Sequence, residues 1–98
     1  MDKPLEKGNW PLIAPSSIPF YPFNNIPREM TDKDMAAVTS DFVSAACKAH
    51  DAGADVLELH MAHGYLLSSF VTPVSNQRTD KYGGSLENRI SFPLQVFD

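Results

Sequence analysis

The sequence is poor in cysteine, in positive charge and in long apolar runs. Cys47 is the single cysteine among 98 residues, so no disulfide can form within the chain. Eight Lys and Arg stand against twelve Asp and Glu, and the net charge of −4 provides no basic surface for nucleic acid. The sequence lacks a long apolar run that would predict a membrane span. It also lacks the charged and then apolar start that would predict a signal peptide. These absences favour a cytoplasmic protein that binds neither nucleic acid nor membrane.

Nucleotide-loop and zinc-protease motifs are also missing. The sequence contains no Gly-x-Gly-x-x-Gly, no Walker pattern and no His-Glu-x-x-His, so Gly83-Gly84 does not predict a phosphate-binding loop. Length sets a further limit. A chain of 98 residues forms one small domain at most. A complete TIM barrel needs roughly 200 residues or more.

The most informative stretch is DVLELHMAHGY at residues 55–65. Its first half predicts a short strand, in which successive side chains point to opposite faces. Glu58 and His60 then share one face, and Leu57 and Leu59 share the other. Leucines on one face and ionisable groups on the other suit a barrel strand that packs on helices and ends in a polar pocket.

Three groups able to polarise and protonate a substrate stand at the end of this strand. His60 would lie at the strand terminus, and His63 and Tyr65 follow in a tight turn containing Gly64. Two neutral imidazoles can each donate one N–H to a single oxygen, and a phenol can deliver a proton. Activated carbonyls and enones need both functions, because negative charge moves onto the oxygen as hydride arrives.

Spacing alone leaves other interpretations open. A His-x-x-His pair can bind a metal ion. The one cysteine that could add a ligand, Cys47, lies well upstream, and we expect no metal here. Histidines can also be structural, and a tyrosine is usually a packing residue with a satisfied hydroxyl. A substrate clamp, structural histidines and a packing Tyr65 are therefore alternatives at this level.

The residues after the strand carry a longer pattern, HGYLLSSF at 63–70 and NQRTDKYGGSLENR at 76–89. This ordered series resembles the flavin-dependent old yellow enzyme family of NAD(P)H:flavin oxidoreductases. The resemblance is strong from about Pro27 to the C-terminus. It implies that the strand is the fourth of a TIM barrel.

The same resemblance implies roles for the three site residues. His60 and His63 would bind the substrate oxygen above the flavin, and Tyr65 would protonate the substrate. FMN would be held mainly by parts of the fold outside this segment, with His60 as the flavin contact offered here. NADPH or NADH would reduce the flavin, and the substrate would be a small carbonyl compound or enone.

We expect an α/β fold, namely the part of a TIM (β/α)8 barrel around its fourth strand with a helix on each side. Thr31 should cap the first helix, and Gly53 should end it. Pro93 should kink the last helix, because it lacks a backbone donor. The expected elements are an irregular proline-rich loop over 1–30, a helix over 31–53, a strand over 54–60, an active-site loop over 61–84 with a helical turn at 66–70, and a helix over 85–98.

Two further groups of residues have structural interpretations. The proline-rich loop is too apolar for a free linker and should lie across a surface, since it contains Trp10, Phe20, Tyr21 and Phe23. A charged group near the last helix could be catalytic, but its placing in a turn and a helix start favours a structural ion-pair network. That group is Arg78, Asp80, Glu87 and Arg89.

The sequence therefore predicts a fragment of an FMN-dependent flavoprotein that reduces activated C=C bonds of carbonyl compounds, an ene-reductase. WPLI, IPREM and FPL also look similar to the reductase-like half of bifunctional monooxygenases that act on salicylyl-CoA or 2-aminobenzoyl-CoA. The alternative from another class is a catalytically silent barrel fragment. Such a fragment would self-associate through exposed strand edges and apolar helix faces.

Overall fold

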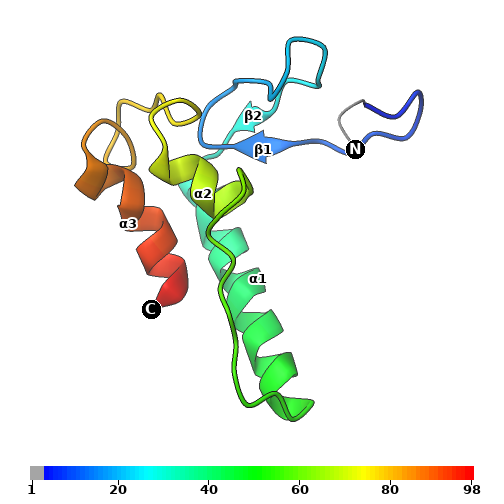
Figure 1. Ribbon diagram of the computed structural model, residues 1–98, viewed down its shortest axis with the longest axis vertical. Coiled ribbons are helices and arrows are strands. Elements are labelled where there is room, and N and C mark those ends of the chain that lie inside the picture. Colours follow the sequence, from blue (N-terminus) through cyan, green and yellow to red (C-terminus); the bar gives the residue numbers. More distant parts are fainter. Residues whose placement is uncertain (1–3) are drawn as a thin grey trace.

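The computed structural model describes residues 4–98, so residues 1–3 of the expected proline-rich loop lie outside the described part. Figure 1 shows α1 as a long rod, with α3 beside it and α2 next to both α3 and β1. The elements in chain order are β1 (Ile13–Ala14), β2 (Arg28–Glu29), α1 (Asp32–Asp51), α2 (Leu66–Val71) and α3 (Leu86–Phe97).

Local capping determines where α1 begins and ends. Thr31 Oγ1 accepts a hydrogen bond from the Asp34 N–H, and the Asp34 carboxylate accepts one from the Thr31 N–H, which completes a capping box. Gly53 follows the helix at φ +90°, a conformation that glycine adopts without steric cost. The helix therefore lies within the range that the sequence predicts.

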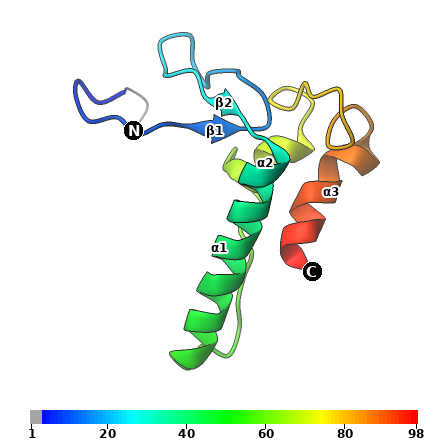
Figure 2. The ribbon, with the colours of Figure 1, turned by 180° about the vertical axis from the view of Figure 1, so that it is seen from behind.

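Residues 54–60 are extended chain and do not form the predicted β-strand. Figures 1 and 2 show this segment running back along α1 with no strand beside it. A strand is defined by backbone hydrogen bonds to a neighbouring strand, and none of the described residues pairs with this segment. The predicted packing face holds only in part. Leu59 packs against the core as predicted, whereas Leu57, which was expected on the same face, is 56% exposed.

The expected loops contain more regular structure than the sequence predicts. β1 and β2 pair in parallel, with Ile13 opposite Arg28, so the range 1–30 is not wholly irregular. The backbone N–H of Met30 donates to the Ala14 carbonyl at 2.9 Å and extends this pairing. The expected loop over 61–84 contains α2, which is longer than the predicted turn by one residue at its C-terminal end.

The buried core lies between α2, α3 and the N-terminal end of α1. The rings of Phe70 and Phe92 pack with centroids 4.6 Å apart, and Tyr82 meets Phe92 edge-on at 6.3 Å. α3 continues through Pro93, which is itself buried, to Phe97. The remaining buried apolar side chains are Met30, Met35, Leu67 and Val96.

The C-terminal half of α1 extends beyond this core. The Cα radius of gyration is 14.6 Å, whereas a compact domain of this size has a value of roughly 13 Å. Phe42 and Val43 on α1 are 36% and 55% exposed, and Val56 on the adjacent extended segment is 84% exposed. An apolar face therefore stays uncovered along α1.

Arg78 joins three separate segments of the chain and is only 8% exposed. Its Nη1 donates to the carbonyl oxygens of Pro15 at 3.0 Å and Met30 at 2.7 Å. Its Nε donates to the Asp80 carboxylate at 3.0 Å, and Nη2 donates to the same group. The hydrogen bond with Asp80 raises the pKa of Arg78 and lowers the pKa of Asp80. Arg78 thus fixes the proline-rich loop and β2 against the turn that follows α2.

The structure confirms a structural ion pair for Arg78 and Asp80 but not for the rest of the predicted charge network. Arg89 Nε instead donates to the Val71 carbonyl at 2.7 Å, and its Nη1 donates to the Gly84 carbonyl. Glu87 forms no ion pair within residues 4–98. Arg89 therefore satisfies backbone acceptors at the end of α2 and in the glycine turn.

The turn around Arg78 leaves little room for substitution at the neighbouring residues. A Cβ on Gly83 would lie 2.0 Å from the Arg78 carbonyl oxygen, so only glycine fits there. The buried Asn76 donates through Nδ2 to the carbonyls of Phe70 at 2.7 Å and Tyr82 at 2.8 Å. Its Oδ1 accepts the backbone N–H of Arg78 at 3.1 Å. These bonds leave no buried side-chain polar atom unsatisfied in the described chain.

Replacing Arg78 by methionine should lower the free energy of unfolding by about 3 kcal/mol, because two buried carbonyls lose their donor and Asp80 loses its cation. Urea denaturation followed by circular dichroism measures the loss. The matched control is Arg28→Met, which removes an exposed guanidinium 2.8 Å from Asp34 and should leave the midpoint nearly unchanged. Equal losses in the two variants would contradict a special role for Arg78.

Stability should fall with acid in a way that depends on Asp80. The folded-state pKa of Asp80 lies below its unfolded value of about 3.9, so its contribution is present above about pH 4 and is lost as pH falls further. Asp80→Asn should therefore be less stable near neutral pH and should show a shallower decline below about pH 4. Parallel stability curves for the two proteins between pH 6 and pH 2 would refute this coupling.

Candidate functional site

A left-handed turn separates the extended segment from α2. His63 and Gly64 have φ values of 58° and 76°. Few non-glycine residues adopt positive φ, and histidine is among those that do so more often. The Gly64 N–H donates to Ser68 Oγ at 2.9 Å, and the Tyr65 N–H donates to the Ala62 carbonyl at 3.2 Å. The chain therefore reverses sharply just before Tyr65, which caps α2.

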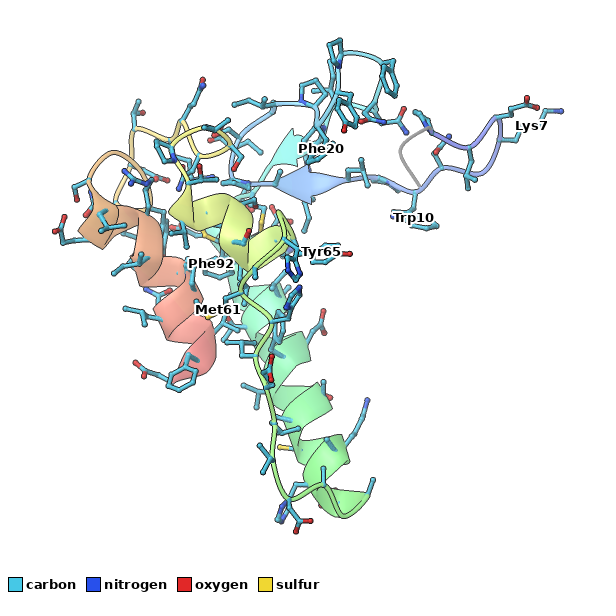
Figure 3. The ribbon with its side chains drawn as sticks, in the orientation of Figure 1. Lys7, Trp10, Phe20, Met61, Tyr65 and Phe92 are labelled. Atoms are coloured by element: carbon cyan, nitrogen blue, oxygen red, sulfur yellow. The ribbon has the colours of Figure 1, made fainter. Side chains whose placement is uncertain are left out.

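This turn brings the three predicted site residues together. The ring centroids of His60 and His63 lie 5.0 Å apart, and those of His60 and Tyr65 lie 5.3 Å apart. Figure 3 shows the Tyr65 phenol projecting outward, whereas Met61 points to the side where Phe92 lies. Residues 59 and 61 pack on the core, and His60 between them is exposed. Period-two alternation thus presents the imidazole even where no strand forms.

The polar atoms of these three rings are available to a ligand. Tyr65 is 59% exposed, and His60 and His63 are also exposed. No residue of the described chain hydrogen-bonds to either imidazole or to the phenol. Because the three side chains are exposed, water can satisfy their polar atoms, and a role in ligand binding stays a prediction. No group of three His, Cys, Asp or Glu side chains in residues 4–98 is arranged to hold a metal ion.

The residues present fit a carbonyl oxygen better than a flavin phosphate. The three arginines, which would be the natural phosphate ligands, are already bonded to protein groups: Arg28 to Asp34, Arg78 to Asp80 and two carbonyls, and Arg89 to two other carbonyls. His60 retains free ring nitrogens for a flavin or substrate atom. The described chain therefore has no arginine-lined phosphate site, and a clamp for a small polar group stays a prediction.

Sequence reasoning missed the residue that stands over this turn. A Cβ on Gly64 would lie 3.9 Å from Cε2 of Phe20, so the Phe20 ring lies near this turn. The aromatic residues of the proline-rich loop did indicate that it lies across a surface. Their partner could not be read from the sequence, because more than forty positions separate Phe20 from Gly64.

A family model identifies the class of protein to which the chain belongs. Residues 14–98 match the model of the NADH:flavin oxidoreductase / NADH oxidase family. The chain therefore belongs to this family. The expected membership is confirmed on most of the chain's length.

Curated relatives place the chain among enzymes named for nicotinamide chemistry. It is 50% identical over 96 residues to an NADH:flavin oxidoreductase of Gibberella zeae, covering 95% of this chain and 23% of the relative. It is 48% identical over 87 residues to an NADPH dehydrogenase of Geobacillus thermodenitrificans, covering 89% and 26%. The chain thus spans about a quarter of the length of these relatives. Neither is named as a monooxygenase, so the resemblance to bifunctional aryl-CoA enzymes gains no support.

Solved structures agree on the fold. Morphinone reductase in complex with tetrahydroNAD superposes with a TM-score of 0.84 at 31% identity, over 89% of this chain and 28% of that protein. A second structure of morphinone reductase, the N189A mutant, gives 0.79 at 33% identity over 86% and 27%. The chain therefore has the fold of one segment of a TIM-barrel oxidoreductase. None of its described helices is long and apolar enough to cross a membrane.

Position 63 provides a test of the turn. His63→Asn should keep the fold, because asparagine tolerates the left-handed conformation, whereas His63→Val should cost about 1–2 kcal/mol in stability. Thermal unfolding of both variants against the parent chain measures the difference. If valine were as stable as asparagine, the left-handed backbone at this residue would not be a constraint.

Proposed function

We propose that this chain supplies the carbonyl-binding and proton-donating groups of an FMN-dependent NAD(P)H oxidoreductase that reduces activated C=C bonds. The observation that supports this is the convergence of His60, His63 and Tyr65 with their polar atoms unbonded within the described chain. Relatives named NADPH dehydrogenase and NADH:flavin oxidoreductase support the same reaction class.

In the proposed reaction, the two imidazoles hold the substrate carbonyl. Ring centroids 5.0 Å apart allow His60 and His63 each to donate one N–H to the same oxygen. Both donors strengthen as negative charge develops there, which lowers the barrier. Because both rings are attached to a short turn next to the core, little reorganisation is needed. FMN, when bound and reduced by NADPH or NADH, would supply the hydride.

Tyr65 completes the proposed reaction as the acid. Hydride addition to an enone leaves a carbanion-like carbon next to the carbonyl, and that carbon must take a proton. The Tyr65 ring lies 5.3 Å from His60, so its hydroxyl can approach a substrate held by the imidazoles. The exposed phenol can then be reprotonated by solvent. A small carbonyl compound is therefore the proposed substrate class.

A second candidate function, self-association without catalysis, is favoured by one observation. The apolar face of α1 with Phe42 and Val43 is exposed, and the backbone of residues 54–60 has no strand partner within the described chain. Unpaired extended backbone next to apolar side chains is a template for pairing with another chain. Size-exclusion chromatography with flavin absorbance separates the two, since a monomeric, yellow, NADPH-oxidising preparation excludes a silent fragment.

Tyr65→Phe should separate the two halves of catalysis in a flavin-loaded protein that contains this segment. Flavin reduction by NAD(P)H does not use the phenol, so its rate should hardly change. Reoxidation by an enone should slow by about 100-fold or more, the scale of a positioned acid. Stopped-flow absorbance at the flavin band measures both steps. A quinone, which needs no proton on carbon, is the matched substrate and should react at the parent rate.

The contrary results for Tyr65→Phe are equal slowing of both half-reactions or no slowing of either. In both cases Tyr65 would be a packing residue. His60→Ala provides the complementary variant, because it should slow enone and quinone reoxidation alike by removing one donor to the carbonyl oxygen, a loss of about 2.7–4 kcal/mol in barrier.

A further inference from the structure

A groove lies beside the three site residues and has no part in the chemistry described so far. It has a volume of about 870 Å³ and runs between the proline-rich loop and residues 64–75. Gly64 and Leu66, which flank Tyr65, form its wall on one side, and Trp10 and Phe20 form part of the other. The groove is therefore continuous with the turn that carries the clamp.

The rings in this groove are unusually exposed. Trp10 is 71% exposed and Phe20 is 77% exposed, and both line the groove together with Gly64. Phe20 makes an edge-to-face contact with its neighbour Tyr21, with ring centroids 4.7 Å apart. Aromatic rings fixed at a surface favour a flat or apolar ligand.

The polar groups in the groove are largely used within the protein. Asn9 exchanges hydrogen bonds with the Leu5 backbone, and Ser16 Oγ accepts the Gln77 N–H at 3.0 Å. Ser69 Oγ donates to the Leu66 carbonyl at 2.6 Å. No lining residue carries a charge. A groove with satisfied polar groups and no charge favours a neutral ligand that makes few hydrogen bonds.

We propose that this groove binds the neutral, non-reacting aryl or hydrocarbon part of the carbonyl compound, and that Phe20 and Trp10 set a preference for substrates that carry a ring. The proposal rests on the proposed function, because it takes the carbonyl oxygen to lie between His60 and His63. The volume is within the range of roughly 300–1,000 Å³ found for small-molecule sites. A ring on the far carbon of the C=C bond would then extend from the clamp past Gly64 into the groove.

The test titrates the full chain with two ketones and follows two kinds of NMR signal. The ring signals of the histidines report binding of both ketones, and the indole N–H signal of Trp10, which is unambiguous because the chain has one tryptophan, reports entry into the groove. The ketones are 4-phenyl-3-buten-2-one and 3-penten-2-one, which differ only by phenyl in place of methyl. Phe20→Ala should weaken binding of the phenyl ketone about tenfold and leave the methyl ketone within twofold. Phe23→Ala, an exposed ring of the same loop that does not line the groove, should change neither.

His60→Ala distinguishes failure of this proposal from failure of the proposed function. It should weaken both ketones by a similar factor, because it acts on the shared carbonyl. If Phe20→Ala is without effect on the phenyl ketone while His60→Ala weakens both, the groove proposal is overturned and the clamp stands. If Phe20→Ala acts selectively while His60→Ala does nothing, the clamp fails and a ring-binding groove remains. An unchanged circular dichroism spectrum establishes that each variant is folded.

Two further outcomes bear on the occupant of the groove. The phenyl ketone with a para-carboxylate should bind more weakly than the parent ketone, because no lining residue can pair with the charge. Tighter binding of the carboxylate would overturn the neutral-ligand assignment. A dimer on size-exclusion chromatography that Phe20→Ala dissociates would show that a second copy occupies the groove, and this would also overturn the proposal.

Discussion

The hydrogen bonds of Arg78 are the interaction on which the rest of this structure depends. One buried guanidinium binds the carbonyls of Pro15 and Met30 and the carboxylate of Asp80. Because Pro15 follows β1 and Met30 follows β2, the same side chain holds both ends of the segment 15–30. That segment carries Phe20, which lines the groove together with Gly64. A single cation thereby connects the turn after α2 with the wall of the groove beside the candidate site.

The candidate site itself needs very little of the fold. His60, His63 and Tyr65 lie within six positions, and a left-handed turn at residues 63–64 brings their rings together. The ring centroid of His60 lies 5.0 Å from that of His63 and 5.3 Å from that of Tyr65. The turn is anchored by α2, whose Leu67 and Phe70 are buried in the core. These local contacts explain how the three rings come together in a chain that spans about a quarter of its relatives' length.

The sequence predicted those features that depend on neighbouring residues. The N-cap at Thr31, the stop at Gly53 and the turn containing Gly64 are all set by residues a few positions apart. It did not predict features that need distant partners. Residues 54–60 have the alternation of a strand but no adjacent strand in the described chain, and alternation alone cannot form a ladder. The approach of Phe20 to the turn at Gly64 likewise left no local pattern.

The central claim is that His60 and His63 bind one carbonyl oxygen together. The most direct measurement is an NMR titration of the histidine ring signals with cyclohex-2-enone, because the chain has three histidines and one of them is an internal control. His50, in the last turn of α1, lies outside the clamp. We predict that the signals of His60 and His63 shift along one common binding curve while the signal of His50 stays unchanged. Separate binding curves for the two rings, or equal shifts at all three histidines, would contradict the shared clamp.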